Sequence, residues 1–349
     1  MKTEVLKITG EKEHDRKVIA KAAEIIRNGG IVAIPTETVY GLAGSALLPG
    51  SAEKIYKAKG RPSDNPLIVH ISEPREAEDI AYTSDMFYRL AERFMPGPLT
   101  VVLPKKDCIP GSVTGGLDSV AVRCPENPIA RALIKASGHP LAAPSANKSG
   151  MPSPTTASHV YHDMNGIIEM IIDGGECSIG VESTVVKPTE DGVMILRPGR
   201  ISERMLRKVA GRVEVAASVK DPSNAEKEKV ESPGMKYRHY SPEAEVILID
   251  APARKYISYV RKHMENGSGA LVTTEHLKDL TGVPEGFTVF DAGKTRSAFE
   301  RSKRIFSILR RADELGLKTV YAQLPPSDGA FLALYNRIVR AAGGRILKI

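Results

Sequence analysis

Short apolar runs alternate with amphipathic segments along most of this chain, and this alternation limits the fold more than any other feature of the sequence. In the first ~210 residues, strand-like runs occupy 31–34, 67–71, 99–103, 119–123, 141–143, 167–172, 183–186 and 193–197. Between them, segments such as 15–28, 51–59 and 84–94 carry apolar side chains at helical spacing. Strands that alternate with helices in this way predict an α/β fold.

The tail of the chain repeats the pattern. From residue 244, strand-like runs at 246–249, 270–272, 288–290 and 320–322 alternate with helical segments at 253–266, 295–315 and 329–342. This order predicts a small α/β domain with a parallel sheet. The tail contains neither a Gly-x-Gly-x-x-Gly nor a Walker A sequence.

The length and a change in composition divide the chain. A chain of 349 residues exceeds what one hydrophobic core usually holds, and 213–230 is rich in Ala, Ser, Lys and Glu without a long apolar face, which is typical of a linker. We expect a first domain at 1–212, a linker at 213–242 and a second domain at 243–349. The end of the linker packs Lys, Arg, His and two Tyr between two prolines. It is either a semi-rigid spacer or a segment that contacts a nucleotide.

Charge and cysteine content narrow the class of protein. A formal net charge of +7 and a pI of about 9.1 favour polyanionic partners such as nucleotides or RNA, although scattered Lys and Arg also keep proteins soluble. An aromatic content of 5% without Trp argues against a broad base-stacking platform. The sequence has no apolar run of membrane-spanning length, no apolar N-terminal signal and no Cys-x-x-Cys pair. We therefore expect a cytoplasmic protein without a membrane segment, a disulfide framework or a metal site of its own.

Three loops at 35–42, 57–66 and 143–150 adjoin predicted strands and are crowded with Pro, Gly, hydroxyl and amide side chains. Loops of this composition are rigid and present many hydrogen-bond donors. Taken singly, the second is equally well a solvated basic turn and the third a tight turn. Together they predict one pocket that holds a phosphate-bearing molecule.

The second and third loops carry the side chains suited to phosphate. Lys57, Lys59 and Arg61 can neutralise a triphosphate, with Arg as a planar fork and Lys as a mobile point charge. Asn65 can donate to a phosphate oxygen or read a base edge. Around Ser145, small residues let backbone amides approach a phosphate, and the serine adds a hydroxyl.

Predicted strands contribute further polar side chains. Alternation along one strand places Ser119 and Arg123 on the same face, where a carboxylate is the natural partner of the guanidinium unless the arginine is simply exposed. His70 lies within an apolar run, where a histidine bonded to backbone is more common than a functional one. Arg197 is either a second phosphate-binding arginine or part of a capped turn. Ser183 is not in a Gly-x-Ser-x-Gly turn and is not expected to be a nucleophile.

Seven motifs in this order together resemble the YrdC-type threonylcarbamoyl-AMP synthases. They are Pro-Thr-Glu-Thr-Val-Tyr-Gly-Leu (35–42), Lys-x-Arg-Pro-x-x-Asn-Pro-Leu (59–67), Pro-Gly-Pro-Leu-Thr (96–100), Ser-Val-Ala-Val-Arg (119–123), Ala-Pro-Ser-Ala-Asn (143–147), Gly-Val-Glu-Ser-Thr (180–184) and Leu-Arg-Pro-Gly (196–199). The segment 232–242 and the tail resemble the long, two-domain form of the family. The resemblance implies a twisted mixed-sheet N-terminal domain with a basic cleft and a smaller Rossmann-like α/β C-terminal domain.

The resemblance also implies a reaction. L-Threonine, bicarbonate or CO2, and ATP would give threonylcarbamoyl-adenylate and pyrophosphate, with Mg²⁺ entering alongside the nucleotide. The product would pass to a partner complex that modifies an adenosine in certain tRNAs, and weak RNA binding would fit the basic charge. The linker would be similar to a flap that closes over the cleft.

By resemblance, the site residues fall into two sets. The threonine set is Thr38, His70, Arg123, Ala143 and Ser183. The ATP set is Arg61, Asn65, Ser119, Ser145, Arg197 and Tyr237, with Lys59 and Arg61 in catalytic roles at the phosphates. Ser119 occupies a position where the family has Ser or Thr, so the hydroxyl is kept.

Two other functions compete with this prediction. A non-catalytic RNA-binding protein could use the same basic cleft, and it would bind RNA with a steep salt dependence and consume no ATP. A carbamoyl-transferring maturation enzyme for metal centres carries a related domain, but such proteins add paired Cys-x-x-Cys elements that this sequence lacks.

Overall fold

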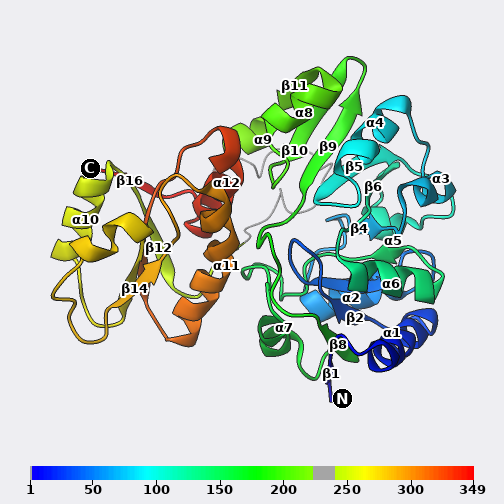
Figure 1. Ribbon diagram of the computed structural model, residues 1–349, viewed down its shortest axis with the longest axis horizontal. Coiled ribbons are helices and arrows are strands. Elements are labelled where there is room, and N and C mark those ends of the chain that lie inside the picture. Colours follow the sequence, from blue (N-terminus) through cyan, green and yellow to red (C-terminus); the bar gives the residue numbers. More distant parts are fainter. Residues whose placement is uncertain (1, 223–239) are drawn as a thin grey trace.

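The computed structural model describes residues 2–222 and 240–349, which form two β-sheets with helices packed against them (Figure 1). The first sheet has eleven strands in the order β1-β8-β2-β3-β7-β4-β6-β5-β9-β10-β11, and its pairings are both parallel and antiparallel. The second has five strands in the order β14-β13-β15-β12-β16, all paired in parallel. The predicted α/β class, with a large mixed sheet and a smaller parallel one, is confirmed.

The strands of the first sheet are β1 (Glu4–Lys7), β2 (Val32–Ile34), β3 (Gly41–Ser45), β4 (Ile68–His70), β5 (Leu99–Pro104), β6 (Ser119–Arg123), β7 (Leu141–Ala142), β8 (Met170–Asp173), β9 (Thr184–Thr189), β10 (Gly192–Arg197) and β11 (Arg212–Val215). Its helices are α1 (Lys12–Arg27), α2 (Ser51–Lys59), α3 (Ala77–Ile80), α4 (Asp85–Phe94), α5 (Gly111–Thr114), α6 (Pro128–Ser137), α7 (Ala157–Met164), α8 (Glu203–Ala210) and α9 (Ala217–Lys220), with a 3-10 turn η1 (Pro74–Glu76).

The second sheet is built from β12 (Glu245–Asp250), β13 (Ser268–Val272), β14 (Thr288–Asp291), β15 (Thr319–Gln323) and β16 (Ile346–Lys348). Its helices are α10 (Ala253–Lys262), α11 (Ala298–Glu314) and α12 (Leu332–Ala341), with 3-10 turns η3 (Thr274–Asp279) and η4 (Gly329–Phe331). None of the helices within residues 2–222 and 240–349 combines the length and apolar character that crossing a bilayer requires.

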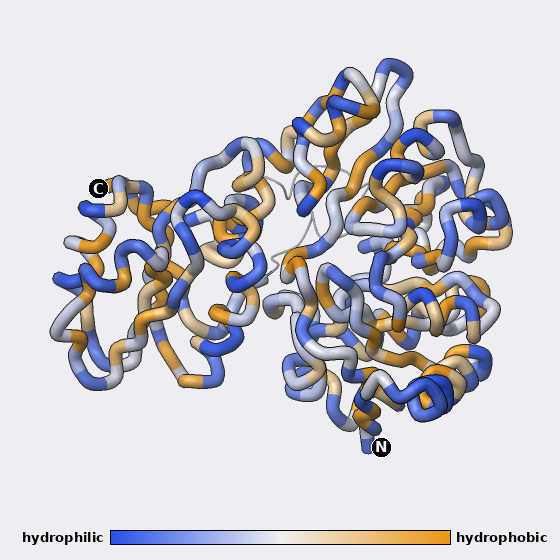
Figure 2. Tube along the Cα trace, in the orientation of Figure 1, coloured by the Kyte–Doolittle hydropathy of each residue, from blue (hydrophilic) through white to orange (hydrophobic). Residues whose placement is uncertain are grey.

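Helices cover the first sheet on both faces because its central strands are buried on both sides. Alternate residues of β2 point to opposite cores, with Ala33 in one and Val32 in the other. Helices α1 and α6 close the core around Val32, and α2, α4, α7 and α8 contribute to the core around Ala33. Figure 2 shows the apolar stretches running through the middle of the molecule and the hydrophilic ones on its outer turns.

The second sheet packs its helices in the same way. Helix α10 covers one face, with Tyr256, Ile257 and Val260 in its core, and helices α11 and α12 cover the other. This all-parallel, doubly covered sheet is the Rossmann-like architecture expected of the tail. Helices α11 and α12 also face the first sheet (Figure 1). Their core includes Val39, Ile179 and Val181, which lie in loops that adjoin that sheet.

The boundary predicted at residue 212 needs a correction. The first sheet extends to Val215 because β11 pairs in parallel with β10, and α9 follows immediately. Val213 and Val219 are buried, and Val215 packs against the same core as Val213. An alternation of only two valines is too short to stand out in a sequence rich in Ala, Ser and Lys. The rest of the predicted linker, 223–239, lies outside the described residues.

Local signals in the sequence place several helix ends correctly. Ser84, Asn127 and Ser202 are typical N-cap residues, and they accept hydrogen bonds from the first-turn amides of α4, α6 and α8. Ser51 is the same kind of residue and its position in the sequence also suggests an N-cap, but that suggestion is wrong, because Gly50, in a left-handed conformation, precedes α2 and Ser51 is its first residue. Gly60 ends the same helix, again left-handed, and so turns the chain into the loop that carries Arg61.

Candidate functional site

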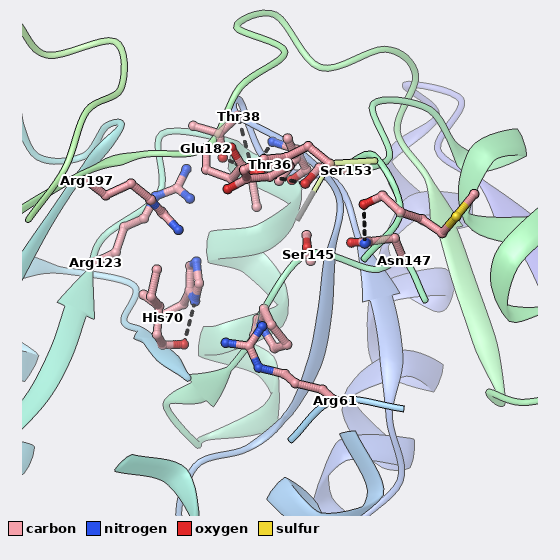
Figure 3. A pocket seen from close by; sticks show the side chains of 17 residues that line it. Thr36, Thr38, Arg61, His70, Arg123, Ser145, Asn147, Ser153, Glu182 and Arg197 are labelled. Atoms are coloured by element: carbon pink, nitrogen blue, oxygen red, sulfur yellow. Dashed lines mark hydrogen bonds between the residues drawn. The ribbon is translucent and has the colours of Figure 1, made fainter. Parts of the chain in front are cut away.

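A pocket lies among the loops at the ends of β2, β4, β6, β7 and β10 (Figure 3). Its wall combines cations, hydroxyls and amides with a few apolar side chains. The lining residues are Thr36, Thr38, Val39, Gly41, Arg61, Ile68, His70, Arg123, Ala143, Pro144, Ser145, Asn147, Met151, Ser153, Glu182, Arg197 and Tyr240. Arg61, Arg123 and Arg197 therefore share one hollow (Figure 3).

Backbone hydrogen bonds join the three loops singled out in the sequence. The amide of Leu42 donates to the carbonyl of Pro144 at 2.8 Å, and the amide of Ser149 donates to the carbonyl of Lys59 at 2.7 Å. A side chain at Gly41 would bring a Cβ within 3.3 Å of the Ala143 Cβ, so glycine permits this close approach. The loops thus form one rigid cradle, as their composition predicted.

Arg123 is held by a carboxylate of the protein. The guanidinium Nη2 lies 2.6 Å from Glu37 Oε1, and both side chains are buried, with 5% and 4% of their surface exposed. Because β4 and β6 are parallel and in register at this point, His70 lies beside Arg123 at the end of the adjacent strand. Glu37, from the first motif, therefore fixes the arginine that the sequence paired with a substrate carboxylate.

Arg197 is fixed by the loop that precedes β9. Its Nε donates to the carbonyl of Ser183 and its Nη2 to the Ser183 hydroxyl, both at 3.1 Å. That hydroxyl also lies 2.7 Å from the hydroxyl of Thr100. Burial lowers the pKa of Arg197. Ser183 thus orients a pocket arginine and does not itself line the pocket.

His70 is a neutral imidazole. Burial, together with the nearby charge of Arg123, lowers its pKa from 6.5 to about 3. Its Nδ1 lies 3.2 Å from the carbonyl oxygen of Ile68, and because a carbonyl can only accept, Nδ1 carries the proton. The other ring nitrogen, Nε2, is therefore an acceptor for a hydroxyl or an amine in the pocket.

Arg61 is held by its own loop. Its Nη2 donates to Asn65 Oδ1 at 2.6 Å and to the carbonyl of Pro66 at 3.0 Å. Burial lowers its pKa to about 10, so the guanidinium is still charged at neutral pH. Asn65 supports Arg61 from behind and is not among the residues that line the pocket.

Lys59 supports the cradle from beneath. Its ammonium donates to the backbone carbonyls of Ser145 and Asn147, at 2.5 and 2.6 Å. The side chain is buried, and desolvation, followed by the charge of Arg61, lowers its pKa well below the usual range. These contacts hold the loop around Ser145 in place, and the catalytic role at the phosphates that the sequence suggests for Lys59 stays a prediction.

Glu182 supplies a carboxylate to the wall of the pocket. Its Oε1 accepts from the Ser153 hydroxyl at 2.5 Å, and its Oε2 accepts from Arg337 Nε, on α12, at 2.9 Å. Burial alone would raise the pKa of Glu182, but the charges of Arg337 and Arg197 outweigh it and keep the pKa below its usual range. The carboxyl is therefore ionised, and one of its partners, Arg337, comes from a helix that packs on the second sheet.

Some of the predicted site residues line the pocket, and others lie behind the lining residues and contact them. Thr38, His70, Arg123 and Ala143 of the threonine set line the pocket, as do Arg61, Ser145 and Arg197 of the ATP set. Ser183, Asn65 and Lys59 lie directly behind lining residues. Ser119 is the first residue of β6 and lines no part of the pocket. Tyr237 lies outside the described residues.

Several residues at the site were missed from the sequence. Thr36, Asn147 and Glu182 line the pocket, and Glu37 holds Arg123. All four stand inside the quoted motifs, so a hydroxyl, acid or amide among loop residues was the available signal. Tyr240 stands in the segment 232–242, which the sequence marked as a possible nucleotide contact, although Tyr237 was the residue chosen there. Ser153 and Arg337 had no such signal, because distant packing brings them to the site.

The pocket does not by itself form a metal centre. Within the parts of the chain that the structure describes, no three His, Cys, Asp or Glu side chains gather to hold an ion. Glu182 is a lining carboxylate, but both of its oxygens already accept hydrogen bonds. A hard cation here would need ligands from a bound anion and water.

Comparison with known proteins agrees with this arrangement. Residues 24–199 match a family model named for Sua5, YciO and YrdC proteins and described as "Telomere recombination". Residues 201–343 match the model for the C-terminal domain of threonylcarbamoyl-AMP synthase. Together the two models cover most of both sheets and leave β1 and β16 outside the matched ranges.

Similar proteins extend over nearly the whole chain. A threonylcarbamoyl-AMP synthase of Pyrococcus abyssi is 44% identical over 94% of this chain and 95% of its own length. One from Bacillus subtilis is 41% identical over 98% and 97%. The structure of a P. abyssi Sua5 protein complexed with L-threonine superposes with a TM-score of 0.88 at 41% identity, covering 100% of both chains.

Proposed function

We propose that this chain, which belongs to the threonylcarbamoyl-AMP synthase family, joins L-threonine, bicarbonate or CO2, and ATP into threonylcarbamoyl-adenylate with release of pyrophosphate. The observation that carries the proposal is the hollow shared by Arg61, Arg123 and Arg197, in a chain similar over its full length to synthases of this name. A cationic hollow of this kind offsets the repulsion between the threonine carboxylate, bicarbonate and the phosphates of ATP.

The threonine subsite is centred on β4 and β6. Arg123, already aligned by Glu37, offers its guanidinium to the threonine carboxylate, while the neutral His70 offers an acceptor nitrogen. Thr38 and Ala143 complete the wall around the small side chain. Ser183 acts through Arg197 in this arrangement, as its hydrogen bonds support.

The nucleotide subsite uses the loops on the other side. Arg61 and Arg197 bind phosphate oxygens as planar forks, and the Ser145 loop, braced by Lys59, presents its hydroxyl and backbone. Mg²⁺ enters with ATP, held mainly by phosphate oxygens and water, and offsets negative charge on the pyrophosphate. No covalent enzyme intermediate is required.

The reaction then consists mainly of positioning. The threonine ammonium first gives up one proton to water, and the free amine then forms a bond to the carbon of CO2 and releases a second proton to water, which gives an N-carboxylate. One oxygen of that carboxylate attacks the α-phosphorus of ATP, and the bond to the pyrophosphate oxygen breaks. Arg61 and Arg197 stabilise the charge that moves onto the leaving group.

The wider role follows from the product. We expect threonylcarbamoyl-adenylate to pass to a tRNA-modifying complex, and the protein to work in the cytoplasm, where tRNA is modified. The reactive carbamate would decompose in water, so a covered pocket is an advantage.

The decisive test is pyrophosphate release in reactions that each omit one component. The proposal predicts release only when ATP, L-threonine and bicarbonate are all present. Release that is indifferent to threonine or bicarbonate would contradict it. The competing RNA-binding function predicts no release, together with salt-steep RNA binding that ATP leaves unchanged.

A further inference from the structure

A helix of the C-terminal domain contacts the wall of the pocket through a buried ion pair. Arg337, on α12, donates from Nε to Glu182 Oε2 at 2.9 Å, and the two side chains are 2% and 9% exposed. Glu182 lies in the motif before β9 and lines the pocket. A cation from the C-terminal domain therefore neutralises a carboxylate in the wall of the N-terminal site.

The same arginine supports a second part of that wall. Its guanidinium carbon lies 5.5 Å from the centre of the Tyr240 ring, and Tyr240 lines the pocket. The ring stacks on Phe306 of α11 with 5.2 Å between centroids. Tyr240 has a φ of 66°, a strained conformation for a non-glycine residue, so packing from the C-terminal domain must hold it there.

The charges explain why this support matters for an anionic ligand. The charged groups that act on Glu182 are Arg337 from α12 and Arg197 from β10, with Lys59 from α2 also coupled to it. Without Arg337, an ionised carboxylate would remain uncompensated by that arginine in a poorly solvated wall of the pocket. A molecule of ATP carries several negative charges, whereas threonine is a zwitterion without net charge, so the penalty falls mainly on ATP.

We propose that Arg337 is a positioning residue of the synthase: by compensating Glu182 and supporting Tyr240, it lets the C-terminal domain set the affinity of the pocket for ATP. The proposal rests on the proposed function for the identity of the nucleotide. It assigns the C-terminal domain a part in the site.

A second buried ion pair between the domains provides a matched control. Arg310, on α11, lies 2.7 Å from Asp163, on α7, and both are about as buried as the first pair. Arg310 also donates to the carbonyl of Pro152. Neither Arg310 nor Asp163 lines the pocket. Breaking this pair loosens the same interface without uncovering a carboxylate in the wall.

The experiment measures the dissociation constants of ATP and L-threonine by calorimetry in the full chain, with melting temperature as a check on folding. Four variants are compared with the unsubstituted protein: Arg337→Met, Arg337→Lys, the double variant Arg337→Met/Glu182→Gln, and Arg310→Met. We expect Arg337→Met to weaken ATP binding by about tenfold and threonine binding by much less. Arg337→Lys, which keeps the charge, should remain close to the unsubstituted protein.

The double variant and the control decide between positioning and simple packing. Removing the orphaned charge with Glu182→Gln should restore most of the ATP affinity lost in Arg337→Met. Arg310→Met should lower the melting temperature but leave the ratio of the two dissociation constants unchanged. Equal losses for both ligands, or a double variant no better than the single one, would overturn the proposal. If Arg337→Met does not fold, the Lys and double variants carry the same comparison.

These outcomes are separate from those that test the proposed function. A protein that binds ATP and threonine as described, but releases no pyrophosphate, would contradict the synthase reaction and leave the role of Arg337 intact. A protein that releases pyrophosphate normally after Arg337→Met, with unchanged apparent KM for ATP, would contradict the role of Arg337 alone.

Discussion

Arg123 is oriented by its ion pair with Glu37, and that ion pair determines what a substitution at either position does. Both side chains are almost fully buried. Removing one partner of such a pair leaves a charge without compensation and typically costs about 3–5 kcal/mol. Loss of binding at this site must therefore be separated from loss of folding.

Replacing Arg123 with Ala should raise the threonine requirement more than the ATP requirement and lower the free energy of unfolding by about 3–5 kcal/mol. Threonine loses the partner of its carboxylate, and Glu37 loses its counter-charge. Titration calorimetry and chemical denaturation measure the two effects. The surface arginine Arg207, paired with Glu203 on α8, is the control, with less than about 1 kcal/mol expected for its Ala variant.

The double variant Arg123→Met/Glu37→Gln separates the two effects further. It carries no buried charge at this position, so much of the lost stability should return while threonine binding stays weak. Equal losses of threonine and ATP affinity in Arg123→Ala would mean that Arg123 does not belong to the threonine subsite.

His70 should make stability fall as the pH falls. Its pKa is about 3 in the folded chain and 6.5 unfolded, so below pH 6.5 the unfolded state binds a proton that the folded state refuses. The expected loss is about 1.4 kcal/mol per pH unit below that value. His159, whose pKa burial lowers to about 4, acts in the same direction.

Denaturation curves between pH 6.5 and 5 test this, because the carboxylates with lowered pKa values, such as Glu182, titrate below that window. The variant His70→Asn should show a shallower pH dependence than the unsubstituted protein, by about one proton. An unchanged slope would mean that His70 is protonated in the folded state and is not the neutral acceptor described above.

Pocket side chains that stand at the end of a strand or helix, within a short motif, could be predicted from the sequence. Arg61, Arg123, Ser145 and Arg197 stand at strand or helix ends within short motifs, and the pocket includes all four. Lys59 was expected at the phosphates, but its ammonium is used by two carbonyls brought close by folding. Sequence spacing shows which loop carries a cation, whereas its partner depends on packing across the fold.

The loop after β10 is held against the loop before β9 at Gly199. A Cβ at this position would lie 2.4 Å from the amide nitrogen of Thr184 and 2.6 Å from the carbonyl oxygen of Glu182. Both neighbours are backbone atoms that cannot swing away. This contact fixes the two segments that carry Arg197 and Ser183.

The variant Gly199→Ala should therefore destabilise the chain by about 1–3 kcal/mol, the usual cost of overpacking, and weaken ATP binding through the displaced Arg197. Gly111, with no heavy atom within 4 Å of its Cβ position, is the matched control. Its Ala variant should stay within about 0.5 kcal/mol of the unsubstituted protein. Similar melting temperatures for both variants would contradict the described packing.

Helices with local start signals were predicted well, and short strands without an apolar pattern were not. Asn127 and Pro128 mark the start of α6 because capping depends on adjacent residues. Strand β3, Gly41–Ser45, was missed because its sequence, Gly-Leu-Ala-Gly-Ser, has little strand propensity. It forms because β2 and β7 provide backbone partners on both sides.

The two domains pack directly against each other near the site. Helix α11 approaches the first sheet so closely that a Cβ on Gly180 would lie 2.4 Å from the Lys303 carbonyl oxygen. Gly180 also has a φ of 79°, so glycine is required twice over. Sequence patterns assign each sheet its own helices, but they do not show which helix face meets the other domain.

Cutting the chain after Pro222 keeps all eleven strands of the first sheet and removes α11 and α12. We expect the shortened chain to fold, because its sheet is complete, but to be less stable, since Val39, Ile179 and Val181 lose their apolar cover. Pyrophosphate release should fall, with the larger change in the ATP requirement. Circular dichroism checks the fold, and an unchanged rate would show that the second sheet has no part in synthesis.

If one hollow joins three substrates into a single product, that product carries atoms from all three. Mass spectrometry of the nucleotide formed from ATP, L-threonine and isotopically labelled bicarbonate tests this. We expect an adenylate that carries both threonine and the labelled carbon, and none of it without threonine. An adenylate that lacks the label, or no adenylate at all while ATP and threonine are bound, would contradict it.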